Sequence, residues 1–218
     1  MTKLQDKPHL TPDALADRIR ACRICRDTPE KDPLPHEPRP VLQVSATARV
    51  CICGQAPGTR VHASGRPFTD PSGDRLRAWM GVDEAAFYDR DKLAIVPMGF
   101  CFPGLDAKGG DLPPRPECRK AWHDDLFAAM PQLELIVLIG QYAQAYHLGP
   151  HRRKSLTETV AAWQTYLEAD RAPGAPAFVP LPHPSWRNNA WLKKNPWFET
   201  NLLPVLRKKI ARLLAPGF

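Results

Sequence analysis

The sequence lacks a long hydrophobic run. Nowhere in its 218 residues does an apolar stretch approach the roughly 18 residues that a membrane span needs. The first residues, MTKLQDKPHLTPDALADRIR, are too polar for the apolar core of a signal peptide. These absences argue against an integral membrane protein and lead us to expect a cytoplasmic one.

Acidic residues are fewer than basic residues. The chain has 23 Asp and Glu against 30 Lys and Arg, which gives a net charge of +7. An excess of positive charge is the electrostatic condition for holding a polyanion, although many basic domains bind no nucleic acid. The charge balance therefore allows a nucleic-acid partner without requiring one.

Cysteine is sparse, at six residues. Because the cytosol keeps thiols reduced and a chain of this length needs no covalent staples, we do not expect disulfides. Metal binding and simple burial remain as explanations for the cysteines. Cys51 and Cys53 alternate with Val50 and Ile52 in an apolar run, so we expect these two to be buried as small hydrophobic side chains.

Four short apolar runs, separated by segments long enough for helices, indicate βα crossovers and a parallel sheet. The runs are Arg49–Cys53, Leu93–Val96, Leu133–Ile139 and Ala177–Leu181. The expected helices are Thr11–Ala21, Ser72–Met80, Arg115–Met130, Gln141–Leu148, Ser155–Ala169 and Trp197–Leu214, the last interrupted by Pro204. We predict one α/β domain over residues 1–218, a three-layer αβα sandwich with a central four-stranded parallel sheet.

The first 45 residues precede the first predicted strand. Thr11 can cap a helix that has Pro12 at its first position. A cysteine pair follows, and then a proline-rich stretch from Asp27 to Pro40 in which fixed φ angles and missing N–H donors exclude a helix or a central strand. We expect an extended surface connector.

Ligands of such sheets bind beyond the carboxyl ends of the strands, and two motifs lie there. Gly54-Gln55-Ala56-Pro57-Gly58 follows the first run, and Gly65-Arg66-Pro67-Phe68 comes shortly after it. Gly54 and Gly58 allow a close approach of the backbone to a ligand, and Phe68 offers a ring on which a base can stack. A tight turn and ordinary core packing of Phe68 are the alternatives.

The second motif, Pro182-His183-Pro184-Ser185-Trp186-Arg187-Asn188-Asn189, follows the fourth run. A histidine fixed between two prolines suits a hydrogen-bond donor that must point at developing negative charge. A purely structural histidine is the alternative.

Four further cysteines are arranged as Cys22-x2-Cys25 and Cys101-x16-Cys118. Four thiolates suit either an iron-sulfur cluster or a structural zinc ion.

Together these motifs resemble the uracil-DNA glycosylase superfamily, most closely its iron-sulfur type, often called family 4. The resemblance rests on GQAPGTRVHASGRPFTDPSGDRL, on His183-Pro184-Ser185 and on the four cysteines. It implies a monomeric, monofunctional glycosylase that flips uracil out of DNA and hydrolyses its N-glycosidic bond, with a four-iron four-sulfur (4Fe-4S) cluster on Cys22, Cys25, Cys101 and Cys118.

The resemblance also implies residue roles. His183 would hydrogen-bond the pyrimidine O2 as the bond breaks, and Trp186, Arg187, Asn188 and Asn189 would enter the minor groove and fill the gap left by the flipped nucleotide. Packing of Trp186 on the last helix is the alternative. The implied base-binding residues are Gly54, Ala56, Pro57, Gly58, Phe68, Pro97 and Ser185.

The sequence departs from the family at three positions. Gln55 stands where the iron-sulfur family usually has Glu, and Ala56 where the best-known uracil glycosylases have Asp. Gln55 can position water but cannot take its proton, so Asp70 is our candidate for the missing carboxylate, ahead of Asp74 and His62. Pro97 replaces an Asn that reads uracil, which predicts a broader range of deaminated bases.

Outside the motifs, Arg152, Arg153 and Lys154 precede a predicted helix, where side chains and helix amides can hold DNA phosphate. A solvated charged surface is the alternative.

Two other functions stay open. One is a non-catalytic or covalently trapping uracil-DNA binder, although the related subgroup traps abasic DNA through a loop histidine and Phe102–Glu117 contains none. The other is a nucleic-acid-binding module with a metal cluster.

Overall fold

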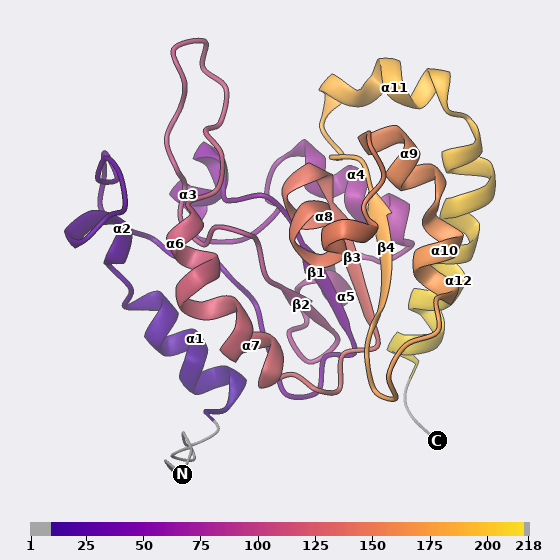
Figure 1. The fold of residues 1–218 in the computed structure, drawn as a ribbon, viewed down its shortest axis with the longest axis horizontal. Helices are drawn as coiled ribbons and strands as arrows, with labels where there is room; N and C mark the ends of the chain where they lie inside the picture. The colour runs from indigo at the N-terminus through magenta and orange to yellow at the C-terminus, as the bar shows by residue number, and fades with distance from the viewer. Residues whose placement is uncertain (1–9, 216–218) are drawn as a thin grey trace.

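A computed structural model describes residues 10–215 and has a parallel sheet at its centre (Figure 1). The strands are β1 (Val50–Cys53), β2 (Leu93–Ile95), β3 (Leu135–Ile139) and β4 (Ala177–Leu181), in the order β2-β1-β3-β4. Val50 pairs with both Leu93 and Leu135, and Leu135 pairs with Ala177. Every strand residue except Phe178 is buried, as expected for a parallel sheet covered on both faces.

Helices form a layer on each face of the sheet. Cys51, Cys53 and Ile136 point into a core that is closed by α1 (Pro12–Arg20), α7 (Asp124–Ala128) and α8 (Gly140–Leu148). Ile52, Val137 and Val179 point into the other core, closed by α4 (Pro71–Met80), α5 (Glu84–Tyr88) and α12 (Leu203–Leu214). The predicted three-layer α/β architecture is confirmed.

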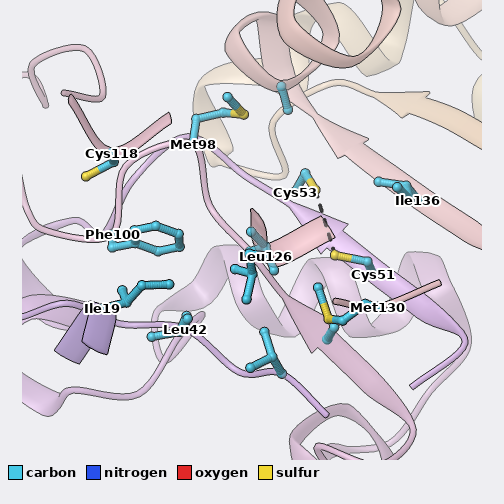
Figure 2. Close-up of a cluster of buried hydrophobic side chains, with 14 of the residues drawn as sticks. Ile19, Leu42, Cys51, Cys53, Met98, Phe100, Cys118, Leu126, Met130 and Ile136 are labelled. Carbon is cyan, nitrogen blue, oxygen red and sulfur yellow. Dashed lines mark hydrogen bonds between the residues drawn. The ribbon is translucent and has the colours of Figure 1, made fainter. Parts of the chain in front are cut away.

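Figure 2 shows the first of these cores. Cys51 and Cys53 lie on the same face of β1 with their sulfurs 3.8 Å apart, near Met130 and Ile136. Both residues are fully buried, and all six cysteines are free thiols. The predicted burial of this pair is confirmed.

The N-terminal segment follows its prediction in part. The Thr11 hydroxyl accepts a hydrogen bond from the Ala14 N–H at 3.2 Å and caps α1 as expected. A single turn, α2 (Ile24–Asp27), was not predicted. The connector is irregular, but it is not purely a surface segment, because Leu34 is completely buried.

Several predicted helix boundaries were wrong. The predicted helix Arg115–Met130 is α6 (Pro116–Cys118), a π-helical stretch η1 (Arg119–His123) and α7. The predicted Ser155–Ala169 is two helices, α9 (Leu156–Ala161) and α10 (Trp163–Glu168). Trp163 and Tyr166, both on α10, pack into different cores.

The C-terminal helix also differs from its prediction. It begins with a π-helical stretch, η4 (Phe198–Leu202), which continues directly into α12, and Pro204 lies in the first turn of α12, just after the change of helix type. Short elements that were not predicted are α3 (Thr59–Ser64), α5, α11 (Asn189–Lys194), η2 (Gly149–His151) and η3 (Trp186–Asn188). Within residues 10–215, no helix is long and apolar enough to cross a membrane.

Candidate active site

The loops that follow β1 and β4 meet in one cavity of about 80 Å³. Nine of the predicted site residues line it, namely Gly54, Gln55, Ala56, Pro57, Gly58, Phe68, Asp70, Pro97 and His183. Val41, Val61, Pro67, Ser72, Ile95 and Asp111 complete the wall. The two motifs, far apart in the sequence, therefore share one site.

The loop after β1 is held by the loop after β2. The Met98 N–H donates to the Gly54 carbonyl and the Gly99 N–H donates to the Gln55 carbonyl, both at 2.9 Å. These bonds continue the β1–β2 pairing past the end of the strands, so the floor of the cavity is an extension of the sheet. Pro97 lies in the same segment and lines the cavity.

Phe68 has an unusual backbone conformation, with φ at 54°. Residues other than glycine rarely adopt this region, and they do so mainly where the surroundings impose it. The Tyr88 hydroxyl is within hydrogen-bond distance of the carbonyls of Pro67, at 2.9 Å, and Phe68, at 3.1 Å. The Phe68 ring meets Phe87 edge-on at 5.9 Å.

Gly73 makes room for Phe68, and Gly54 lies beside its ring. A Cβ on Gly73 would lie 1.9 Å from the Phe68 carbonyl oxygen, so position 73 tolerates no side chain without movement of Phe68. A Cβ on Gly54 would lie 3.5 Å from the Phe68 Cζ, so the ring reaches across to the loop after β1. The ring is thus a fixed wall of the cavity.

His183 is held in one tautomer. Its Nδ1 accepts a hydrogen bond from the Ser185 N–H at 3.3 Å, and the Asn188 side-chain amide donates to the His183 carbonyl at 2.7 Å. With Nδ1 acting as acceptor, the proton of the neutral ring is on Nε2. Burial lowers the pKa of His183 below its ordinary value, so near neutral pH the residue is a neutral donor.

Ser185 does not line the cavity, and its backbone positions His183 instead. Sequence reasoning missed its partner, Arg75, which donates to the Ser185 carbonyl at 3.1 Å and to the Asn189 side chain at 2.8 Å. Arg75 thereby joins α4 to the segment after β4. Asn188 and Asn189 both make contacts within the chain.

Trp186 does not pack on the last helix, because 73% of its surface is exposed. The Arg187 guanidinium lies 5.9 Å from the centre of its ring. The prediction that these two side chains enter DNA stays open, and their exposure is what such a role requires.

The carboxylates differ from expectation. Asp70 lines the cavity, but its Oδ1 accepts hydrogen bonds from the Ser72 N–H at 3.0 Å and the Gly73 N–H at 3.2 Å, and also from the Ser72 hydroxyl. It caps α4. Asp74 pairs with Arg77 on the helix surface, outside the cavity lining. Asp111, which was not predicted, lines the cavity as well.

His62, the other alternative, also lies outside the cavity lining. Its ring contacts His36 at 4.3 Å and Phe102 at 5.7 Å, measured between ring centres.

The four remaining cysteines gather at a second place. Cys22, Cys25, Cys101 and Cys118 line one small cavity of about 10 Å³, together with the apolar side chains of Ile19, Leu34 and Phe100. In Figure 2, Cys118 lies near Phe100, away from Cys51 and Cys53. Within residues 10–215, no group of three or more His, Cys, Asp or Glu side chains is close enough to hold a single metal ion.

The basic cluster lies outside the cavity lining. Arg152, Arg153 and Lys154 are exposed, and the two arginines line a separate groove of about 480 Å³ with Arg171. The hydroxyl of Ser155 accepts a hydrogen bond from the Glu158 N–H at 3.1 Å. One of the free amides of α9 is therefore already satisfied.

Comparison with known families agrees with this geometry. The model of the uracil DNA glycosylase superfamily matches residues 42–207 of the 218. The match includes the whole sheet, both cavity loops, Cys101 and Cys118, and it begins after Cys22 and Cys25. The chain belongs to the uracil DNA glycosylase superfamily.

Proposed function

We propose that the protein is a monofunctional DNA glycosylase that removes uracil, and other deaminated bases, from DNA by hydrolysis of the N-glycosidic bond. The observation that carries this proposal is the meeting of Phe68 and His183 in one cavity at the carboxyl ends of β1 and β4. An extruded base can stack on the flat ring of Phe68 and accept a hydrogen bond from His183. We further propose that the enzyme initiates base excision repair in the cytoplasm.

In the proposed reaction, the damaged base leaves the DNA stack and packs against Phe68. Extruding a base costs a few kcal/mol, and stacking on an aromatic ring returns about 1–3 kcal/mol. The Nε2–H of His183 donates to the pyrimidine O2, where negative charge collects as the bond to the sugar breaks. Because the ring is neutral, it donates without carrying a charge of its own into the cavity.

Pro97 supports a broad base range. It lines the cavity, yet it has neither a side-chain amide nor a backbone N–H to offer to a base edge. A site that makes few specific hydrogen bonds rejects related bases only weakly. Hypoxanthine, xanthine and ethenocytosine are therefore substrates to test beside uracil.

The second proposal concerns the four clustered cysteines. Four sulfur donors in one apolar cavity suit a 4Fe-4S cluster, which holds one thiolate on each iron and so spaces the sulfurs more widely than one zinc ion does. Cys22, Cys25, Cys101 and Cys118 would hold it. Bound there, the cluster would supply a structural link between the N-terminal segment and the loop after β2.

One assay separates the candidate functions. The protein is incubated with a uracil-containing oligonucleotide, treated with alkali and run on a denaturing gel, with the undamaged oligonucleotide as the control. A glycosylase gives strand cleavage at the uracil position only after alkali. Cleavage without alkali would contradict a monofunctional reaction, a band of covalent protein-DNA adduct would indicate a trapping protein, and binding without cleavage would indicate a non-catalytic module.

A further inference from the structure

The loop between β2 and α6 folds into a hairpin that projects beyond the edge of the sheet, beside α3 (Figure 1). Leu105 and Asp111 form an antiparallel bridge, and the Leu112 N–H donates to the Gly104 carbonyl at 3.0 Å. At the tip, Asp106 accepts hydrogen bonds from the N–H groups of Lys108 and Gly110, each at 2.8 Å. The hairpin is thus ordered by its own contacts.

One residue of this hairpin, Asp111, reaches the candidate active site. It lines the cavity together with Gln55 and His183. A Cβ on Gly58 would lie 3.5 Å from the Asp111 Oδ2, so the carboxylate lies beside the loop after β1. The Gln55 amide donates to the Leu112 carbonyl at 3.4 Å, which places its polar end next to Asp111.

Asp111 is chemically freer than Asp70. The Asp70 Oδ1 is engaged by three donors at the start of α4, so this oxygen already serves the helix cap. Among residues 10–215, no side-chain or backbone donor hydrogen-bonds to the Asp111 carboxylate, and the ionisable groups near it are Arg187, His183 and Asp70. Capping holds one oxygen of Asp70, whereas both oxygens of Asp111 are available.

The surroundings also favour Asp111 as a general base that accepts a proton. The residue is exposed as a whole, yet partial burial of its carboxyl group raises the pKa of Asp111 above its ordinary value, with Arg187 and His183 acting in the opposite direction. A raised pKa makes a carboxylate a better proton acceptor.

We infer that Asp111 is the carboxylate that activates the attacking water. This inference rests on the proposed glycosylase function. As the C1′–N bond breaks, its electron pair leaves with the base, whose O2 is held by His183. The water oxygen bonds to C1′, and its proton passes to the Asp111 carboxylate. Asp111 later releases this proton to solvent, and the base anion takes up a proton, leaving an abasic sugar and a neutral base.

The same carboxylate supplies negative charge near the positive sugar of the transition state. Gln55 then has the role that its chemistry allows, which is to orient the water without taking its proton. The carboxylate that is missing from the loop after β1 is replaced from a different loop.

The test compares Asp111→Asn with Asp70→Asn in single-turnover excision of uracil. General-base catalysis contributes about 10²–10⁴-fold, so Asp111→Asn should slow excision by at least about a hundredfold. Asp74→Asn, on the exposed side of α4 and outside the cavity lining, is the matched control and should stay within severalfold of the parent. Asn caps helices about as well as Asp, so Asp70→Asn keeps the cap of α4 and should slow excision less than Asp111→Asn does. DNA affinity and circular dichroism should be unchanged in all three, and Asp111→Ala serves as a second variant.

The outcomes distinguish the two claims. If the parent excises uracil and folded Asp111→Asn does so at a near-normal rate, the role of Asp111 is overturned. The proposed function would still stand. A large loss in Asp70→Asn alone would return the role to Asp70. No excision of any base by the parent protein would overturn the proposed function itself. A rate that falls with acid in the parent but not in Asp111→Asn would support the inference.

Discussion

At the scale of single residues, the cavity depends on the close contact between Gly73 and Phe68. In a helix, Gly→Ala ordinarily stabilises by up to about 1 kcal/mol. Here the new methyl group would lie 1.9 Å from the Phe68 carbonyl oxygen and would force the strained Phe68 segment to move. We predict that Gly73→Ala lowers single-turnover excision at least about tenfold.

The control for this prediction is Asp74→Ala, on the exposed side of the same helix. It should fold and react normally. Full activity of Gly73→Ala would mean that the position of Phe68 does not matter for base binding.

Buried histidines predict a pH dependence of stability. Burial lowers the pKa of His123 to about 4 and that of His147 to about 3, whereas an unfolded histidine titrates near 6.5. Between these values the unfolded chain binds more protons, so the free energy of unfolding is highest above pH 6.5 and falls as the pH drops toward 4.

Each such histidine can contribute at most about 1.4 kcal/mol per pH unit in that window. Urea unfolding at pH 7 and pH 5 measures the effect. His147→Phe should reduce the dependence, because the His147 Nε2 is buried with no hydrogen-bond partner and the ring packs among Phe127, Tyr146 and Phe178. The same dependence in this variant would assign the effect to other groups.

At the scale of elements, the strands could be predicted and the short helices could not. The four strands are fully apolar runs because both faces of the sheet are covered. By contrast, α3, α5 and α11 have too few residues for a hydrophobic period to be visible. The break between α9 and α10 has no proline or glycine to mark it in the sequence.

Some residues of the candidate site could likewise be predicted from the sequence, and others could not. Gln55, Phe68 and His183 could be placed from sequence because each follows a strand end within a recognisable motif. Asp111, Arg75 and Tyr88 could not, because their positions depend on how a hairpin and two helices fold back over the sheet. Asp70 was placed near the cavity correctly, but its capping contacts were not foreseen.

The clustered cysteines come from separate elements: Cys22 follows α1, Cys25 lies in α2, Cys101 lies in the loop after β2, and Cys118 ends α6. We predict that the purified protein is brown and contains iron and sulfide, and that Cys101→Ala and Cys118→Ala lose both. Cys51→Ala is the matched control, since Cys51 lies on β1 outside the small cavity. Zinc in place of iron would keep the ligands and change the metal, and a metal-free, fully active protein would contradict the site.

At the scale of the whole molecule, the net charge of +7 predicts that DNA affinity falls steeply with salt. Each lost phosphate contact should lower the slope of log affinity against log salt by about one. Replacement of Arg152, Arg153 and Lys154 by Gln should therefore flatten the slope. The charge-matched control replaces Lys208, Lys209 and Arg212 on α12. An equal slope in the two triple variants would assign the first cluster to solvated surface.

His183, from the loop after β4, lines the cavity together with the loop after β1. The structure keeps Nδ1 occupied by the Ser185 N–H and leaves the proton on Nε2 for the departing base. A donor that acts on developing charge strengthens only as the transition state is reached, so its loss lowers the chemical rate more than binding. One such donor contributes about 2.7–4 kcal/mol, or about a hundred- to a thousandfold in rate.

The most direct test is single-turnover excision of uracil by His183→Ala beside the parent protein. If His183 is the donor to the departing base, the rate is lower by about a hundred- to a thousandfold. DNA affinity stays within severalfold of the parent, and the circular dichroism spectrum is unchanged. Near-normal excision by the folded variant would show that the chemistry takes place elsewhere.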